Sequence, residues 1–237
     1  MGDPVRFLIH GASGRMGRAL LRLCADGAVE GCSVVAAVSR QPAQRVVDGV
    51  PQFAASEIRG VPAFDVAIDF SLPEGFDPLL ALCRQRGAAL VSGTTGLSDA
   101  QRQALADAAT DIPVLWAANF SLGVAVLDEL VERAAAALAG WDCDIVETHH
   151  VHKKDAPSGT ALALGAAAER SGAGPRDASL RAGDVGGEHL GQFTGAGERI
   201  ELVHRATSRD VFARGALLAA SRLHGRDAGA WRLRDLL

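Results

Sequence analysis

The sequence predicts an α/β protein: a doubly wound parallel sheet with a second, smaller α+β domain inserted before a C-terminal helix. Three observations support this prediction. Short apolar strands alternate with helical segments over residues 1–120, a glycine-rich turn directly follows the first strand, and the alternation stops where a long helix begins at Leu122. We therefore expect one domain over residues 1–120, a second over 121–208, and a segment over 209–237 that returns to the first domain.

Composition places the chain among ordinary globular proteins. Its 237 residues are 48% hydrophobic and 22% charged, with a formal net charge of −4. This charge gives no reason to expect nucleic acid or an anionic membrane as a partner. The four cysteines are scattered without a Cys-x-x-Cys pattern, as is typical of reduced thiols. No apolar run reaches membrane-spanning length and no signal-peptide pattern precedes the first strand, so we expect a cytoplasmic protein.

The first strand and the turn after it indicate a nucleotide site. A buried strand is predicted over Val5–Ile9, followed directly by Gly11-Ala12-Ser13-Gly14-Arg15-Met16-Gly17. The apolar side chains of the next helix share one face: Met16, Ala19, Leu20, Leu23 and Cys24. Strand, glycine turn and helix in this order bind the phosphates of a dinucleotide at the helix N-terminus. The spacing is Gly-x-x-Gly-x-x-Gly rather than Gly-x-Gly-x-x-Gly, so a tight turn without a ligand remains an alternative.

The end of the second strand bears on the choice of cofactor. The strand is predicted over Ser33–Val38 and ends in Ser39-Arg40. An acidic residue at this position holds the ribose 2′-hydroxyl of NAD. A hydroxyl and a guanidinium favour the 2′-phosphate of NADP instead. An arginine after a strand is common, however, so this position alone decides little.

Further strands and helices complete the first domain. The predicted elements are the strand Asp65–Ser71, a helix from about Pro78 to Arg86, the strand Ala88–Ser92, a helix near Asp99–Ala109 and the strand Pro113–Ala117. Gly93-Thr94-Thr95-Gly96 follows a strand at its carboxyl end, where an open parallel sheet binds its ligand. Repeated β-α units of this kind predict the doubly wound sheet.

The second domain is predicted from a change of pattern. One long helix covers Leu122–Ala139, and the strand Asp144–Glu147 follows it. After a further helix that begins at Ser158, residues 181–189 are polar and rich in glycine, and Arg199–Arg205 alternates like a half-exposed strand. The last helix carries Phe212, Leu217, Leu218 and Leu223, and we expect it to pack on the first domain.

Residues 147–160 concentrate the groups that carry chemistry. Three histidines and two lysines lie within this stretch: His149, His150, His152, Lys153 and Lys154. Ser158 is a favourable N-cap for the alanine-rich helix that follows. A helix N-terminus offers amide donors and partial positive charge, which suit an anion. Cations, imidazoles and amides together therefore predict a site for a carboxylate-bearing substrate that also needs a proton.

Two other interpretations of the same stretch stay open. A histidine-rich run also occurs in solvated surface loops. It also binds metals, and in an extended segment His150 and His152 share one face. No carboxylate or cysteine stands at a familiar ligand spacing beside them, and the neighbouring lysines oppose a dication.

Taken together, these motifs resemble the dihydrodipicolinate reductase (4-hydroxy-tetrahydrodipicolinate reductase) family over nearly the whole chain. The resemblance rests on the following segments: Gly11–Gly17, Ile68-Asp69-Phe70-Ser71, Ser92–Gly96, Ala117–Ser121, Glu147–Thr160, Gly187-Glu188-His189 and Arg205–Arg209. It implies a Rossmann-like first domain and NAD(P)H-dependent reduction of 4-hydroxy-tetrahydrodipicolinate in lysine and diaminopimelate biosynthesis. The histidine stretch is the specific part of the resemblance.

The resemblance also implies roles for individual residues. It makes His149 the proton donor, Lys153 its catalytic partner, and His150, Gly159 and Thr160 ligands of the substrate carboxylates. The residues that it implies for cofactor binding are Gly11, Ala12, Ser13, Gly14, Arg15, Met16, Arg40, Gly93, Thr94, Thr95, Ala117, Ala118, Asn119 and Phe120. Many members carry an acidic residue where Ser39 stands here, so we expect NADPH to be preferred and NADH to be possible. No metal is required.

The family further implies that residues 121–208 bind substrate and form a homotetramer. In the sequence this rests on Ile200, Leu202 and His204, which alternate along one strand. Two other classes of function remain: a metal-dependent hydrolase that uses His149, His150 and His152, and a dinucleotide-sensing module without catalysis. The absence of tyrosine excludes the Tyr-x-x-x-Lys dyad of short-chain dehydrogenases.

Overall fold

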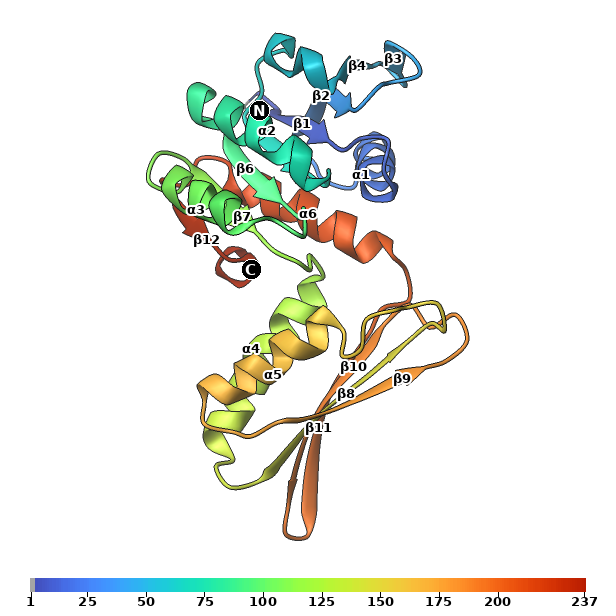
Figure 1. Ribbon diagram of the computed structural model, residues 1–237, viewed down its shortest axis with the longest axis vertical. Helices are drawn as coiled ribbons and strands as arrows, with labels where there is room; N and C mark the ends of the chain where they lie inside the picture. Colours follow the sequence, from blue (N-terminus) through green and yellow to red (C-terminus); the bar gives the residue numbers. More distant parts are fainter. Residues whose placement is uncertain (1–2) are drawn as a thin grey trace. The chain divides into compact units, whose positions relative to one another are not determined.

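The computed structural model describes residues 3–237 and divides into two compact units (Figure 1). The first unit contains the chain up to Phe120 together with Phe212–Leu237. The second unit is continuous and runs from Ser121 to Val211. Within the described residues, no helix is both long enough and apolar enough to span a membrane.

The first unit is built on an eight-stranded sheet in the order β12-β7-β6-β5-β1-β2-β4-β3. Its strands are β1 (Val5–His10), β2 (Cys32–Ser39), β3 (Val46–Val47), β4 (Val50–Ala54), β5 (Val66–Asp69), β6 (Ala89–Ser92), β7 (Pro113–Trp116) and β12 (Gly229–Trp231). Every neighbouring pair is parallel except β3 with β4. The order reverses at β1, so the carboxyl ends of β1 and β5 flank the point where such sheets bind ligand. The expected doubly wound α/β fold is confirmed.

Helices connect these strands. They are α1 (Arg15–Ala25), the 3₁₀ helix η1 (Ala55–Gly60), α2 (Pro73–Arg86), α3 (Asp99–Ala108), α6 (Asp210–Leu223) and the 3₁₀ helix η2 (Leu233–Leu236). The sequence prediction placed the start of α2 at Pro78, but the helix begins at Pro73. Proline is favoured in the first turn because the N–H it lacks has no intrahelical partner there. Two prolines compete for that position here, and the one nearer the N-terminus occupies it.

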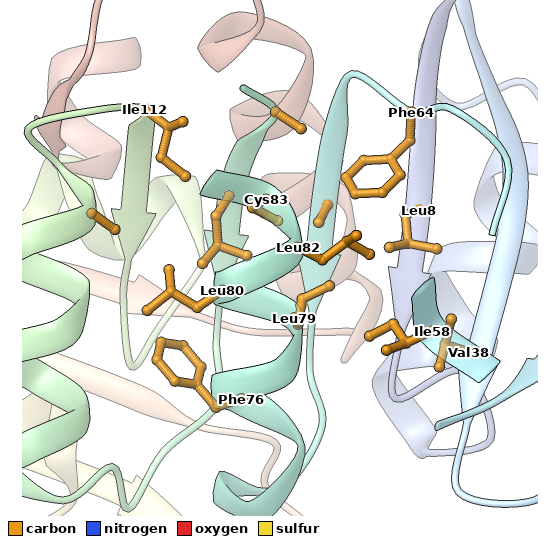
Figure 2. Packing of buried hydrophobic residues seen from close by; sticks show 14 of the residues in the cluster. Leu8, Val38, Ile58, Phe64, Phe76, Leu79, Leu80, Leu82, Cys83 and Ile112 are labelled. Atoms are coloured by element: carbon orange, nitrogen blue, oxygen red, sulfur yellow. The ribbon is translucent and has the colours of Figure 1, made fainter. Parts of the chain in front are cut away.

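The core of the first unit packs α2 against the sheet and the edge helix η1 (Figure 2). Phe76, Leu79 and Cys83 on α2 are each 0% exposed. They lie in the same cluster as Leu8 of β1 and Ile58 of η1. Burial of each such large apolar side chain contributes roughly 1.5–3 kcal/mol. This core fixes the positions of the strand ends that carry the polar residues discussed below.

Gly11, the first residue after β1, is required by both backbone conformation and space. Its φ is +78°, in the region that favours glycine. A Cβ at this position would lie 2.4 Å from the carbonyl oxygen of Phe70, which follows β5. The turn therefore passes against the backbone at the end of the neighbouring strand, and a side chain is excluded there.

The second unit is a four-stranded sheet with two helices packed against one face (Figure 1). Its elements are α4 (Leu122–Ala137), β8 (Asp142–His149), α5 (Gly159–Arg170), β9 (Arg176–Arg181), β10 (Glu188–Gly195) and β11 (Glu198–Arg205). The strand order is β11-β10-β8-β9, and only the β8–β9 pair is parallel. Strand β9 was missed in the sequence because it is short, four of its six residues are polar and five are exposed.

The two faces of strand β11 have different surroundings. Leu202 packs against the cluster formed by α4, α5 and the sheet, and His204 is half-buried. Val203, on the opposite face, is 42% exposed and pairs with Leu190 of β10. Of the two exposed large apolar side chains of this strand, Val203 therefore lies on the face opposite to the helices, whereas Ile200 shares the face of Leu202 nearer the strand start.

Candidate active site

The residues implied for cofactor binding lie at one edge of the parallel sheet of the first unit. Residues 11–16 connect β1 to α1, Arg40 follows β2, residues 93–95 follow β6, and residues 117–120 follow β7. Ser13, Gly14, Arg15, Arg40 and Thr95 are exposed. All four segments are at the carboxyl ends of parallel strands, which is where a doubly wound sheet binds a dinucleotide.

A buried carboxylate joins three of these strand ends. Asp69, the last residue of β5, is 0% exposed. It accepts hydrogen bonds from Nδ1 of His10 at 2.8 Å, the amide of Ser71 at 3.1 Å, Oγ of Ser92 at 2.9 Å and Oγ1 of Thr94 at 2.8 Å. Burial alone would raise the pKa of Asp69, but these bonds, led by the one from His10, hold the pKa below its usual value. The carboxylate is therefore ionised. It connects β1, β5 and β6 at the carboxyl ends of these strands, where the cofactor site is predicted.

Two of the predicted cofactor residues have structural roles in the unit itself. Phe120 is 1% exposed, and its ring packs edge-on against Phe70 with centroids 5.4 Å apart. The carbonyl of Thr94 accepts a hydrogen bond from Nε1 of Trp116 at 2.8 Å, and Thr94 is itself buried. A ligand at the carboxyl ends of these strands would therefore contact the backbone of Phe120 and Thr94 rather than their side chains.

The geometry of the first turn suits the phosphates of a dinucleotide. The cap position of α1 is Gly14, which has an extended backbone and no side chain to cap the helix. The helix N-terminus therefore presents its amides and partial positive charge without a competing side chain. These residues fit a dinucleotide cofactor.

The second group of predicted residues gathers in the second unit around His149, the last residue of β8. Its Nδ1 is hydrogen-bonded to Oε2 of Glu147, two residues earlier on the same face of the strand. The side chain of Glu147 is 0% exposed and that of His149 is 12% exposed. Burial alone would raise the pKa of Glu147, but hydrogen bonds led by the one from Arg181 hold it at about 2. An ionised carboxylate only accepts, so Nδ1 of His149 carries the proton in this pair.

Arg181 and the start of α5 complete the surroundings of Glu147. The guanidinium of Arg181, on β9, lies 2.9 Å from Oε1 of Glu147. The same oxygen accepts a hydrogen bond from the amide of Ser158 at 3.3 Å. Ser158 is the N-cap of α5, as predicted, and its Oγ accepts from the amide of Ala161 at 3.2 Å. The carboxylate of Glu147 is therefore held from β8, β9 and α5.

Further imidazoles lie in the same unit. The ring of His189 on β10 is 5.2 Å from that of His149, centroid to centroid, and 6.4 Å from that of His204 on β11. Nε2 of His189 is hydrogen-bonded to Oγ of Ser158 at 3.3 Å. Burial lowers the pKa of His189 to about 4 and also lowers the pKa of His204. These two rings are therefore neutral near pH 7.

The loop between β8 and α5 holds the remaining predicted residues. The ammonium of Lys153 bonds to both oxygens of Asp155, at 2.9 and 2.8 Å. His150 and His152 have ring centroids 6.2 Å apart, and the pKa of His150 is lowered, first by burial and then by the charge of Arg209. Gly159 and Thr160 are the first two residues of α5. The histidines, Lys153 and the helix N-terminus are thus in one part of the unit, as the sequence predicts.

Several residues at these two sites were given no individual role from the sequence, although most of them lie in the motifs that carry the resemblance. They are Asp69, Glu147, Asp155, Arg181 and His189. Glu147 and His149 stand two residues apart on a strand, a spacing that places both on one face and was a usable signal. The pairing of Arg181 with Glu147 depends on the parallel alignment of β9 with β8, for which the sequence carries no local pattern. Over residues 3–237, no group of three or more His, Cys, Asp or Glu residues has the arrangement of a metal site.

A parallel sheet with a glycine turn at its first strand, together with a unit that holds a carboxylate-paired histidine beside cations, defines an NAD(P)H-dependent oxidoreductase. Family models agree in detail. "Dihydrodipicolinate reductase, N-terminus" matches residues 5–120, and "Dihydrodipicolinate reductase, C-terminus" matches residues 123–237. The chain belongs to the dihydrodipicolinate reductase family.

Individual relatives support the same assignment. The chain is 76% identical to the 4-hydroxy-tetrahydrodipicolinate reductase of Stenotrophomonas maltophilia (strain R551-3), covering 99% of this chain and 98% of the relative. It is 71% identical to the enzyme of the same name from Xanthomonas axonopodis pv. citri (strain 306), with the same coverage. A solved dipicolinate-bound dihydrodipicolinate reductase from Paenisporosarcina sp. TG-14 has the same fold, with a TM-score of 0.82 and 23% identity over 99% of this chain and 100% of that one.

Proposed function

We propose that the protein reduces 4-hydroxy-tetrahydrodipicolinate to tetrahydrodipicolinate with NAD(P)H, in lysine and diaminopimelate biosynthesis. The observation that carries this proposal is the pairing of His149 with the buried carboxylate of Glu147, beside Lys153 and the N-terminus of α5. This arrangement offers a proton and positive charge together, as reduction of a dicarboxylate imine requires. Relatives that share 76% and 71% of their residues over nearly the whole chain carry this activity in their names.

Binding of the cofactor is assigned to the first unit. The amides at the start of α1 would receive the pyrophosphate, and residues 93–95 and 117–120 would border the nicotinamide end. When bound, reduced nicotinamide supplies the hydride. The hydrogen bonds of Asp69 to Ser92 and Thr94 fix the turn after β6, so this border is preorganised.

Substrate binding and protonation are assigned to the second unit. Loss of water from the substrate leaves a conjugated imine with two carboxylates. Lys153, His150 and the first residues of α5, Gly159 and Thr160, supply the positive charge and amide donors that such carboxylates need. After hydride addition an enamine carbon must gain a proton, and the imidazolium of His149 donates it. Asp155 already occupies the ammonium of Lys153, so a substrate carboxylate shares this cation with it or displaces it.

An assay of cofactor oxidation tests the proposal. The substrate is made in situ from pyruvate and aspartate semialdehyde, and the loss of reduced nicotinamide absorbance is followed. We expect turnover that depends on both precursors and on the protein. Absence of turnover by folded protein, with nucleotide binding retained, would instead support a dinucleotide-sensing module, and activity that requires an added metal would support a hydrolase-like site at the histidines.

We further propose that NADPH is preferred over NADH. The support is Arg40, which follows β2 and is exposed, and the absence of a carboxylate at the neighbouring position, Ser39. A guanidinium makes charge-assisted hydrogen bonds to a 2′-phosphate, whereas a ribose diol lacks a carboxylate partner here. Equal kcat/KM values for the two cofactors in the wild-type protein would contradict this preference.

We also propose that the protein forms a homotetramer through the second unit and that it is located in the cytoplasm. The support for assembly is the sheet face opposite to α4 and α5, where Val203, Leu190 and Val146 form a row across three strands. Val203 is 42% exposed in the single chain, and such a row needs a cover. Light scattering that gives the mass of one chain at micromolar concentration would contradict the homotetramer.

The support for the cytoplasmic location is that all four cysteines are free thiols.

A further inference from the structure

The inference concerns Glu147, and it rests on the proposed function. We propose that Glu147 is a positioning residue for proton transfer: its carboxylate holds His149 by Nδ1, so that Nε2 is the nitrogen that meets the substrate. The family resemblance assigns a role to His149 but none to Glu147, and the case for Glu147 comes from its contacts in this structure.

The carboxylate of Glu147 is held in place at both of its oxygens. Its side chain is fully buried, Oε2 bonds to His149, and Oε1 receives Arg181 at 2.9 Å and the amide of Ser158 at 3.3 Å. Both oxygens are therefore occupied by groups from three different elements. A buried ionised carboxylate with its partners in place fixes the orientation of the ring that it bonds.

The hydrogen bond from Nδ1 of His149 to Glu147 decides the tautomer of His149. Because the carboxylate is an acceptor only, the Nδ1 proton stays on His149 in both of its protonation states. Nε2 therefore holds the exchangeable proton. In the proposed reaction the Nε2–H bond breaks, its electron pair remains on Nε2, and the proton forms a C–H bond at the enamine carbon. The neutral imidazole that remains still donates Nδ1–H to Glu147 and regains a proton from solvent.

The other ring nitrogen of His149, Nε2, is left accessible. Gly187 lies beside this nitrogen, with a φ of +147°, and a Cβ there would be 3.1 Å from Nε2. The absence of a side chain at this position keeps the space next to Nε2 open. The neighbouring ring of His189 cannot take the same role, because its Nε2 is bonded to Ser158 and burial lowers its pKa to about 4.

The pH dependence of the reaction reflects the titratable and charged groups around His149. These groups are Glu147 on β8, Arg181 on β9, His189 on β10, His204 on β11, and His150, His152, Lys153 and Asp155 in the loop before α5. Glu147 is the one that bonds to the ring of His149. Its replacement by glutamine keeps the shape of the side chain but removes the charge that stabilises the imidazolium.

The experiment compares kcat as a function of pH in the full-length wild type and in Glu147→Gln. General-acid catalysis is lost as the pH rises and His149 deprotonates, so the wild-type profile falls on its alkaline side. In Glu147→Gln we expect this fall to move to lower pH by about one unit or more and kcat at neutral pH to drop roughly 10- to 100-fold. KM for NADPH should stay within about twofold. Glu169→Gln, which removes an exposed charge near the far end of α5, is the matched control and should leave the profile in place.

A second measurement depends neither on turnover nor on the folding of Glu147→Gln. In protein with ¹⁵N-labelled histidine, long-range ¹H–¹⁵N correlations distinguish the two neutral tautomers, and the His149 signals are assigned from their loss in His149→Asn. We expect the Nδ1–H tautomer in the wild type. An Nε2–H tautomer, or an unmoved pH profile in folded Glu147→Gln, would overturn the proposal. If the wild type has no reductase activity but shows the Nδ1–H tautomer, the failure lies in the proposed function and not in the role of Glu147 toward His149.

Discussion

Asp69 in the first unit and Glu147 in the second are both fully buried carboxylates that accept a hydrogen bond from Nδ1 of a histidine, but their other partners differ. Asp69 is surrounded by neutral donors, two hydroxyls and one amide, all at strand ends. Glu147 is backed by the cation of Arg181, whose side chain is 20% exposed on an edge strand. The histidine beside Asp69 is 4% exposed and that beside Glu147 is 12% exposed.

This difference separates two uses of the same kind of group. The carboxylate of Asp69 accepts hydrogen bonds from four groups on strand ends and loops, and so connects these segments. The carboxylate of Glu147 favours a positive charge on the ring of His149, although the cation of Arg181 partly offsets this effect, and the His149 side chain is the more exposed of the two histidines. We therefore infer that the first unit uses its buried charge for rigidity, and that in the proposed reaction the second unit uses its buried charge to position a proton donor.

The strongest test of this distinction is removal of the proton donor itself. His149→Ala should lower kcat by about 10²–10⁴-fold, which is the usual contribution of a positioned general acid. Cofactor affinity should remain near wild type, because the residues implied for the cofactor belong to the first unit. Steady-state kinetics and nucleotide titration measure the two quantities. A near-normal kcat would show that His149 is not the donor.

Loss of the carboxylate of the first unit should instead act on stability. Asp69→Ala leaves four donors without their acceptor, three of them in the buried residues His10, Ser92 and Thr94, and disruption of such a network costs about 3–5 kcal/mol of unfolding free energy. Ser92→Ala removes one donor while three remain, and should cost only about 1 kcal/mol. Urea unfolding of the two variants gives the comparison. Similar costs for both would mean that Asp69 does not act as the centre of the network.

Acid should affect the second unit before the buried carboxylate of the first. The pKa of His189 is about 4 in the folded protein and 6.5 in the unfolded chain, so the unfolded state binds the proton first as the pH falls. Stability is therefore lost from pH 6.5 down to about 4, by roughly 3 kcal/mol from this residue. Asp69 has a pKa lowered from 3.8, so its contribution persists until the pH falls below that value.

Hydrogen exchange at pH 7 and pH 5 measures this contrast within one sample. Amides of β10 should lose more protection at pH 5 than amides of β5. The variant His189→Gln, which does not titrate, should show a smaller difference between the two pH values. Equal losses in β10 and β5 would contradict the assignment of acid sensitivity to the second unit.

The smallest effect is expected at the exposed end of β2. Arg40→Ala should raise KM for NADPH roughly 10-fold and leave the kinetics with NADH nearly unchanged, since only the 2′-phosphate needs the guanidinium. Unfolding free energy should not change, because Arg40 is exposed and lies outside the network of Asp69. Parallel kinetics with both cofactors test this, and an equal loss with NADH would show that Arg40 contacts a part common to both.

The sequence predicted what local patterns encode. Apolar runs identified the parallel strands β1, β2, β5, β6 and β7 but not β4 and β12. Ser158 was correctly predicted as an N-cap, and the glycine turn correctly indicated the start of α1. The networks around Asp69 and Glu147 were not predicted, because their partners come from strands that are distant in the chain. His10 and Asp69 meet because β1 pairs with β5, and Arg181 reaches Glu147 because β9 aligns with β8. Such pairings depend on the register of the folded sheet, which hydrophobic periodicity does not specify.

The interruption of the first unit by the second has a consequence for the synthesis of the chain. When residue 211 leaves the ribosome, every strand and helix of the second unit has been made, while the first unit still lacks most of α6 and the edge strand β12. Ala213, Leu217 and Leu223 of α6 are each 0% exposed in the finished unit, so the apolar surface that they cover stays open to water until the last residues are made. A circularly permuted gene that starts at residue 121 and joins 237 to 1 would complete each unit in a single pass of translation.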